Sequence, residues 1–194
     1  MIAPSQNSIA VPAKDNPFAT FRTDSLAFRF PAGQWPEQLN RLAALNFRAA
    51  IVGAQGTGKT TLLNELSLKL RDLDFKPVFA RASAALVHDL LARIEPNQVI
   101  LLDSAEQLPR RLWWELVWRT RGLCGLVVTV HRRCLLPTWI RCNSSPELAG
   151  NLLRELGVAD LDSATLASAF ARHRGNIRDL FRSLYDDFAS GKLT

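Results

Sequence analysis

The feature that most constrains the fold is an alternation of short, strand-like runs with amphipathic helical patterns. Strand-like runs occupy residues 48–53, 76–80, 98–103 and 124–130, and a shorter run follows at 139–142. Between them, leucines recur at helical spacing, as at Leu62, Leu63, Leu66 and Leu70. Continuous apolar strands joined through helices are typical of a parallel sheet covered on both faces. The sequence therefore predicts an α/β fold built on a parallel sheet.

The two ends of the chain have a different character. Three successive helices are predicted over 146–156, 163–174 and 176–190, without a strand between them. Residues 1–23 are rich in Pro, Ser, Asn and Ala and show no period. We therefore expect three parts: a flexible N-terminal arm over 1–23, a core over 24–142 and a small helical subdomain over 143–194.

Composition excludes several classes of protein. Of the 194 residues, 47% are hydrophobic and 22% are charged, which excludes a disordered chain, a collagen-like fibre and a coiled-coil rod. No apolar run approaches the roughly 18 residues that would span a bilayer. The first fifteen residues contain Lys14 and Asp15 and lack the apolar stretch of a signal peptide. We therefore expect a cytoplasmic protein without a membrane span.

A glycine-rich motif stands between the first predicted strand and the helix that follows it. Residues Gly53, Ala54, Gln55, Gly56, Thr57, Gly58, Lys59 and Thr60, with Thr61 directly after them, fit the pattern GxxxxGK[ST]. Glycines let the backbone approach phosphate and point its N–H groups inward, and the helix N-terminus adds a favourable dipole. The lysine can reach the β- and γ-phosphates, and the threonine hydroxyl can ligate Mg²⁺. The motif predicts a nucleotide-binding P-loop and, with the alternating elements, a three-layer P-loop NTPase fold.

A second element of such a site is the run Val99-Ile-Leu-Leu-Asp103, an apolar strand that ends in a carboxylate. Asp103 is positioned to hold Mg²⁺ opposite Thr60. Hydrolysis also needs a group that orients or deprotonates water, and many P-loop ATPases carry Glu directly after this Asp. Ser104 occupies that position here, and the nearest carboxylate is Glu106. Glu106 is therefore the candidate water-activating residue, and solvation of the next helix is the alternative role.

Four segments together resemble the AAA+ class of P-loop ATPases. They are GAQGTGKTT at 53–61, VILLDSAEQL at 99–108, Thr129-Val-His131-Arg132 at the end of the next strand, and Gly175-Asn-Ile-Arg178 at the start of the last helix. Asn16-Pro17-Phe18 is also similar to the NPF lead-in of bacterial ExeA-like and TniB-like ATPases. The likeness spans about residues 16–184.

The resemblance implies further roles for particular residues. The C-terminal helices would form a small lid, and Arg178 would be its "sensor 2" arginine, which reaches the γ-phosphate. Thr129 or His131 would occupy the "sensor 1" position, and the segment before the first strand would run near the adenine. An arginine finger acting in trans would come from Arg132, Arg133 or Arg141. The candidate catalytic residues are then Lys59, Asp103, Glu106 and Arg178.

Basic charge is concentrated in one segment. The net charge is +6, and residues 108–141 hold seven arginines against one acid, Glu115. Trp113, Trp114 and Trp118 lie on the helix predicted over 109–120 in this segment. Two interpretations stay open: burial of the tryptophans beside a solvated basic face, or a surface that binds a protein partner, another copy of the chain or DNA.

The sequence leaves three functions open. The first is an ATPase that uses ATP and Mg²⁺ to switch conformation. The second is a nucleotide-dependent adaptor that binds ATP without hydrolysing it and holds DNA or a protein; Ser104 favours this one, and Arg178 favours the first. The third, weaker alternative is a small-molecule P-loop kinase. The chain contains no guanine-reading NKxD sequence, which favours ATP over GTP.

Overall fold

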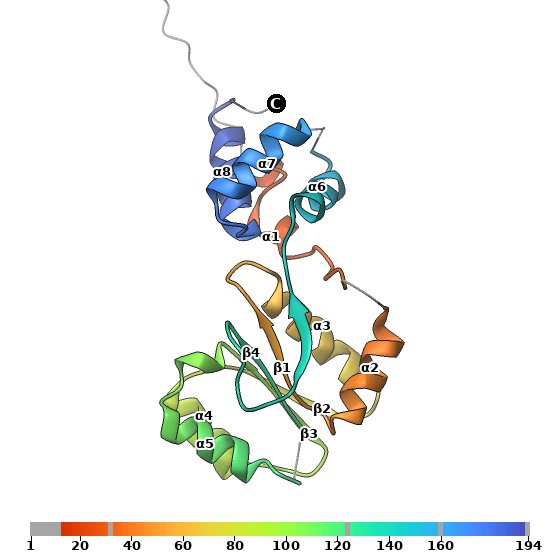
Figure 1. Cartoon of the computed structure of the whole chain (residues 1–194), viewed down its shortest axis with the longest axis vertical. Coiled ribbons are helices and arrows are strands. Elements are labelled where there is room, and N and C mark those ends of the chain that lie inside the picture. Colours follow the sequence, from red (N-terminus) through yellow and green to blue (C-terminus); the bar gives the residue numbers. More distant parts are fainter. Residues whose placement is uncertain (1–12, 31–32, 123–124, 159–160, 193–194) are drawn as a thin grey trace, which may run out of the picture. The chain divides into compact units, whose positions relative to one another are not determined.

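The computed structural model describes residues 13–30, 33–122, 125–158 and 161–192. The chain divides into two compact units (Figure 1). The sheet unit comprises residues 27–143, and the helical unit combines the described residues 13–26 with 144–192. One unit is thus continuous in sequence, and the other is built from both ends of the described chain.

A five-stranded parallel sheet forms the centre of the sheet unit (Figure 1). The strands are β1 (Arg48–Gly53), β2 (Lys76–Arg81), β3 (Gln98–Asp103), β4 (Gly125–Val130) and β5 (Thr138–Cys142). Their order in the sheet is β2-β3-β4-β1-β5. The predicted parallel sheet is confirmed, and the strand order places β4 between the strands that carry the glycine-rich motif and Asp103.

Helices cover both faces of this sheet because its strands are apolar on both faces. Ala49 and Ile51 of β1 join one core cluster, whereas Ala50 and Val52 join the other, as the two-residue period of a strand requires. Helices α2 (Trp35–Ala44) and α3 (Lys59–Arg71) pack on the first face. Helices α4 (Ala84–Ala92) and α5 (Arg110–Arg119) pack on the second (Figure 1).

The helices predicted over 109–120, 146–156, 163–174 and 176–190 form, and their ends differ from the predicted ones by at most two residues. Ser83 is the N-cap of α4, as its residue type suggests, and its hydroxyl accepts a hydrogen bond from the amide of Leu86. Pro109 precedes α5 as its N-cap rather than standing in the first turn. A short 3₁₀ helix, η2 (Ala105–Gln107), stands between β3 and α5.

The helical unit contains α6 (Pro146–Glu155), α7 (Ser163–Arg172) and α8 (Ile177–Ala189), together with η1 (Ala13–Asp15) and α1 (Thr20–Thr23). Phe18 is only 4% exposed, and its ring centroid lies 5.9 Å from that of Phe181 on α8. Asn16 is fully buried and donates a hydrogen bond to the carbonyl oxygen of Tyr185. The part of the predicted arm that the structure describes, residues 13–23, is therefore packed into the helical unit rather than loose.

The unit boundaries also differ from the predicted ones. The sheet unit begins at Ala27 rather than at residue 24, and it ends at Asn143 rather than at residue 142. Residues 1–12 of the predicted arm and Cys124 of the predicted fourth strand lie outside the described residues. Within the described ranges, no helix combines the length and apolar character needed to cross a bilayer.

Candidate functional site

The candidate residues of the sheet unit gather at the carboxyl edge of the parallel sheet. The glycine-rich loop leaves β1 at Gly53, Asp103 ends β3, and Thr129 stands one residue before the end of β4. Because the strands are parallel and β4 lies between β1 and β3, these three chain segments meet at one edge. Ligand sites of open α/β sheets are typically built at this edge.

The loop between β1 and α3 has the tight backbone that the glycines predict. Gly56 and Gly58 have φ angles of +74° and +82°, a conformation that residues with a side chain rarely adopt. A Cβ atom at Gly53 would lie 2.5 Å from the carbonyl oxygen of Cys142 and 2.7 Å from the Thr57 hydroxyl. That hydroxyl donates to the carbonyl oxygen of Ala54 at 2.9 Å. The loop therefore curls over itself, and the glycines leave no side chains in the way of its backbone.

Lys59, the first residue of α3, lies inside this curl. The residue is only 9% exposed, and its Nζ donates to the carbonyl oxygen of Ala54 at 2.7 Å. A largely buried ammonium held at the mouth of a helix N-terminus is well placed to transfer its hydrogen bond to an incoming anion. Thr57 is also buried, whereas Ala54 and Gln55 are exposed and Thr61 is half-buried.

Asp103 is at the centre of a hydroxyl–carboxylate cluster. The Thr60 hydroxyl lies 3.2 Å and 3.3 Å from the two carboxylate oxygens of Asp103. The Thr129 hydroxyl donates to Asp103 Oδ1 at 2.6 Å and accepts a hydrogen bond from the amide of Ser104 at 2.7 Å. Thr129 is fully buried, so its hydroxyl fixes the orientation of the carboxylate. The structure brings together the two predicted metal ligands and one of the two sensor 1 candidates.

His131, the other sensor 1 candidate, has a different partner. Ser104 has a φ of +61°, and this left-handed residue turns the chain sharply from β3 into η2. The turn places Glu106 beside His131, with 3.4 Å between Glu106 Oε1 and His131 Nδ1. Both side chains are partly exposed, 31% for Glu106 and 48% for His131. Glu106 is thus paired with His131, whereas Asp103 is paired with the two threonines.

Glu106 and His131 line a pocket of about 400 Å³ between η2, the start of α5 and the loop after β4. Its lining includes apolar side chains such as Leu108, Trp113 and Val130. Its basic side chains come from two elements, Arg110 at the start of α5 and Arg132 and Arg133 of the loop. The lining of the pocket therefore combines apolar side chains with several cations.

Arg178, the predicted sensor 2 residue, belongs to the helical unit. Gly175, with a φ of +76°, separates α7 from α8, and Asn176 is the N-cap of α8. The Asn176 side chain accepts a hydrogen bond from the amide of Asp179 at 3.2 Å. Arg178 is exposed in the first turn of α8, where the helix dipole disfavours a cation. The helix predicted over 176–190 is confirmed as α8, which begins one residue later than predicted.

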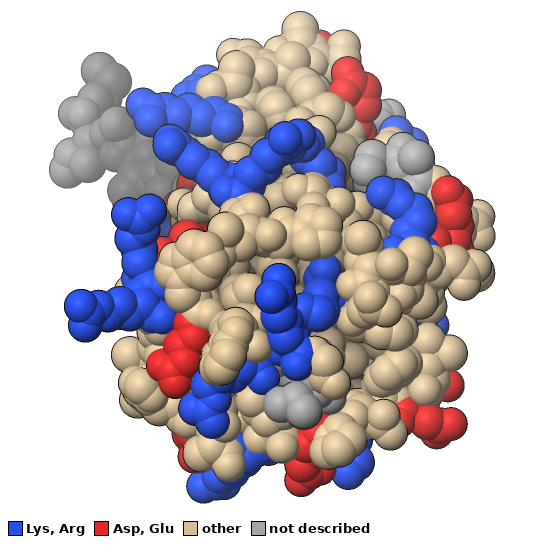
Figure 2. All heavy atoms as spheres, turned by 60° about the horizontal axis from the view of Figure 1, so that its bottom comes forward, with Lys and Arg blue, Asp and Glu red and all other residues tan. Residues whose placement is uncertain are grey.

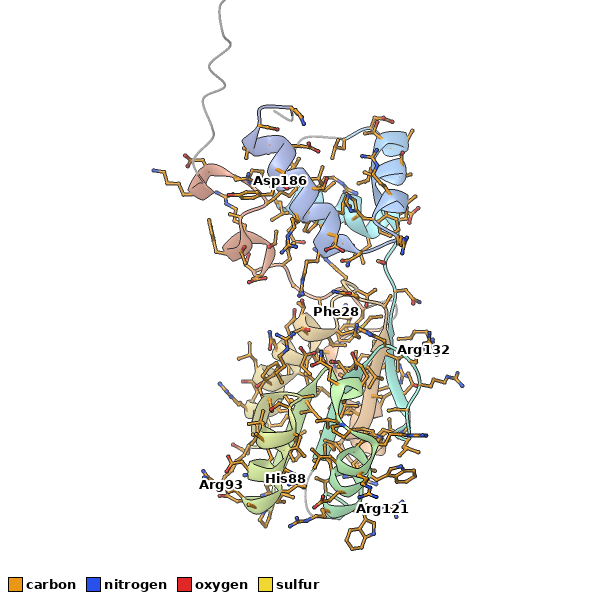
Figure 3. The ribbon with its side chains drawn as sticks, turned by 90° about the vertical axis from the view of Figure 1, so that its left-hand side faces the viewer. Phe28, His88, Arg93, Arg121, Arg132 and Asp186 are labelled. Carbon is orange, nitrogen blue, oxygen red and sulfur yellow. The ribbon has the colours of Figure 1, made fainter. Side chains whose placement is uncertain are left out.

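The three candidates for an arginine finger are all exposed. Arg132 and Arg133 lie in the loop after β4, and Arg141 lies on the edge strand β5. Figure 3 shows Arg132 toward the same end of the sheet unit as Phe28, with Arg121 toward the opposite end.

Phe28 and Cys142 also lie beside the loop between β1 and α3, and no pattern in the sequence predicts this. A Cβ atom at Gly58 would lie 3.2 Å from the ring of Phe28, and the amide of Phe28 donates to Glu65 Oε1 of α3 at 2.6 Å (Figure 3). Cys142 is 2% exposed at the end of β5, and burial raises the pKa of its thiol to about 12, while the positive charge of Lys59 opposes this shift. Only folding brings these residues to the loop, so no local pattern marks them.

Comparison with known proteins adds no assignment. No model of a known protein family matches the sequence, and no curated protein matches it.

Proposed function

We propose that this chain is an ATP-binding P-loop protein of the AAA+ type, and that it hydrolyses ATP to switch conformation. The observation that carries the proposal is the approach of Thr60 to Asp103, 43 residues apart in sequence, directly beside a curled glycine loop. A motif match alone requires only a local pattern. Here the hydroxyl and the carboxylate that the chemistry needs also meet in space.

The loop fits a nucleotide phosphate chain. Gly53 has no room for a side chain, and Gly56 and Gly58 adopt left-handed backbone conformations. In loops of this kind, successive N–H groups commonly form a concavity that binds anions. The N-terminus of α3 adds orphan N–H donors and a favourable dipole. Lys59 would exchange its bond to the Ala54 carbonyl for bonds to the β- and γ-phosphates.

The donor set also fits Mg²⁺. This ion prefers oxygen ligands and is usually held by one or two protein groups together with phosphates and water. Thr60 and Asp103 would provide the protein ligands, with Thr129 holding the carboxylate in place. When bound, the ion would supply charge neutralisation for the phosphates.

Hydrolysis depends on Glu106 in this proposal. Ser104 holds the position next to Asp103, and its left-handed backbone directs the following residues into η2. Glu106 then lies against His131, and this contact orients a carboxylate that would accept a proton from water. The contact with His131 equally favours the second candidate function, an adaptor that binds ATP and whose Glu106 has only a structural contact with His131.

The test is Mg²⁺-dependent binding and hydrolysis of ATP by the purified chain, with GTP measured in parallel. Lys59→Ala should weaken ATP binding by about ten- to hundredfold, because hydrogen bonds to charged groups contribute roughly 1.5–3 kcal/mol. Lys69→Ala is the matched control, since Lys69 lies on the same helix and its side chain is partly exposed. Unchanged ATP affinity in folded Lys59→Ala protein would overturn the site assignment.

Two further variants separate the candidate functions. If the chain is an ATPase, Glu106→Gln should abolish turnover while ATP binding persists. Tight binding without turnover in the wild type, with turnover gained in Ser104→Glu, would instead identify the adaptor. Phosphoryl transfer from ATP to a small acceptor would support the kinase alternative.

A further inference from the structure

The outer surface of α5 carries an exposed aromatic and basic stripe. Trp118 is 72% exposed and Trp114 is 57% exposed, and the four-residue spacing puts both indoles on one side of the helix. The opposite side of α5 is buried through Leu112 and Leu116, which belong to the core cluster of the sheet unit. The two tryptophans therefore contribute little to the core, and packing does not explain their presence.

Arginines extend this stripe at both ends. Arg111 precedes Trp114 by three residues and Arg121 follows Trp118 by three, and both arginines are exposed. Together these four residues define the α5 stripe. Arg111, Trp114 and Trp118 lie within α5, which has ten residues and a length of about 15 Å, and Arg121 follows two residues after the end of the helix.

The position of the first arginines is unfavourable for the helix itself. Arg110 and Arg111 occupy the first turn of α5, which contains no acidic residue. A cation at a helix N-terminus is opposed by the helix dipole, by roughly 0.3–1 kcal/mol. Helix stability thus does not account for these two residues, whereas an external anion would benefit from both of them.

The chain segment that carries the stripe contains little negative charge. Glu115 is the only acid between residues 108 and 141, and its carboxylate pairs with Arg119 at 3.3 Å. Figure 2 shows basic side chains interleaved with uncharged ones on the lower end of the sheet unit of Figure 1. A stripe of indole and guanidinium groups with its acid already paired offers charge complementarity to a polyanion.

We propose that the α5 stripe binds single-stranded nucleic acid, with bases stacked on Trp114 and Trp118 and phosphates paired with Arg111 and Arg121. The indoles are separated along the helix axis by about 6 Å, so each can take a separate base. Bases of a duplex are already stacked on one another, whereas single strands expose base faces to aromatic side chains.

Other partners fit this surface less well. Insertion into a membrane needs a wide apolar helix face, and the aliphatic side chains of α5, Leu112 and Leu116, are buried in the core instead. An acidic protein would satisfy the arginines, but it would also need exposed apolar side chains to cover the two indoles. Nucleic acid matches both kinds of side chain.

The stripe continues into the pocket at the start of α5. Arg110 lies next to Arg111 in sequence and lines the pocket, as do Trp113 and Arg132. A volume of about 400 Å³ lies within the range of small-molecule sites and exceeds what a single base needs. A single-stranded nucleic acid that follows the α5 stripe toward Arg110 therefore reaches this pocket. There, Trp113 and the arginines offer a site for one further nucleotide.

The test measures binding of fluorescein-labelled oligothymidylate and oligouridylate of about 20 nucleotides to the full chain by fluorescence anisotropy. Wild-type protein should bind both single strands, or one of them, more tightly than the matched duplex. Affinity should fall as salt rises from about 50 to 200 mM. The double variant Trp114→Ala/Trp118→Ala should lower single-strand affinity at least about tenfold.

The matched control is Leu68→Ala/Arg71→Ala on α3, which packs on the other face of the sheet and replaces an exposed apolar side chain and an exposed arginine. This variant should bind single strands like the wild type. Circular dichroism and thermal unfolding should show that both double variants are folded.

Four results would overturn the proposal. The first two are absence of single-strand binding at low salt and equal single-strand affinity of the tryptophan variant and the wild type. The third is binding of the duplex that is as tight as binding of the single strand, or tighter. The fourth is that polyglutamate displaces the labelled oligonucleotide as well as unlabelled oligonucleotide of the same total charge does. Binding to phosphatidylserine–phosphatidylcholine vesicles that is lost in the tryptophan variant, without single-strand binding, would reassign the stripe to a membrane surface.

Discussion

Thr129 is the residue on which the geometry around Asp103 depends most directly. Its buried hydroxyl both donates to Asp103 and accepts from the amide of Ser104. Thr129→Val keeps the shape but leaves that amide and one carboxylate oxygen without this partner. We expect a loss of roughly 1–3 kcal/mol in the free energy of unfolding, measured by urea denaturation.

Thr129→Ser provides the control for this prediction, because it keeps the hydroxyl and removes only a methyl group. It should cost about 1 kcal/mol or less and should preserve Mg²⁺-dependent ATP binding, which Thr129→Val should weaken. Equal stability of the valine variant and the wild type would mean that the hydrogen bonds of Thr129 do not hold the site together.

Because the thiol of Cys142 is buried, we expect the stability of the folded chain to depend on pH. Burial raises the pKa of its thiol to about 12 in the folded chain, against an ordinary value of 9.0. Between these values the unfolded chain releases the proton while the folded chain keeps it, so stability falls as pH rises from about 9 toward 12. Cys142→Ala should make this decline less steep, as measured by urea denaturation at several pH values. Identical slopes for both proteins would show that the thiol does not contribute.

At the residue scale, local sequence patterns predict which of the candidate residues lie close together. The motif at 53–60 and the carboxylate of Asp103 follow from sequence spacing, and the structure brings Thr60 to Asp103. Phe28 and Cys142 could not be found in this way, because only tertiary folding brings the Phe28 ring to Gly58 and the end of β5 to Gly53. The contact of Glu106 with His131 depends on the left-handed backbone of Ser104, which the residue type does not favour.

At the scale of the element, α5 separates residues that stabilise the fold from residues that face outward. Leu116 is fully buried in the core cluster, whereas Trp118 is 72% exposed. Leu116→Ala should lower the free energy of unfolding by about 2–5 kcal/mol. Trp118→Ala should change it by about 0.5 kcal/mol or less, although the side chain removed is larger. Thermal or urea unfolding of both variants checks this contrast, and a large loss in Trp118→Ala would place that indole in the core.

The elements themselves are well predicted because their patterns are strong. The strands alternate between two buried faces, and the helices carry leucines on one side, so both periods are clear in the sequence. Helix ends are less well predicted, since the final turns depend on local hydrogen bonds. Trp113 lines the pocket, whereas Trp114 and Trp118 are exposed, so the interpretation that all three tryptophans are buried is wrong.

At the scale of the whole molecule, the segment around Phe18 belongs with the last helix rather than with the residues that follow it. Phe18→Ala removes a buried ring from the core of the helical unit and should cost about 3 kcal/mol in that unit. Hydrogen exchange should accelerate in α8 and remain unchanged in the sheet. Phe21→Ala, which truncates a ring that is 62% exposed, is the control and should affect neither unit. Equal acceleration in both units would contradict this assignment.

Sequence patterns could not reveal this association. The NPF segment has no helical or strand period, and its partner is more than 160 residues away in sequence. Three residues are too few to show from the sequence whether the NPF segment packs against the rest of the chain or is loose. The division into a sheet region and a helical region can be predicted because the hydrophobic period of the sequence changes at the boundary. The sequence carries no comparable signal that the helical unit also includes the N-terminal segment.

The discontinuous helical unit has a consequence for the order of events during synthesis. The sheet unit is complete once residue 143 has emerged from the ribosome, but Phe18 has no partner ring until Phe181 is made. At about 5–20 residues per second, the nascent chain exposes this phenylalanine for roughly ten to thirty seconds. During translation, the segment around Phe18 therefore emerges before the sheet unit but folds after it, and a chaperone that binds exposed apolar residues would meet it in that interval.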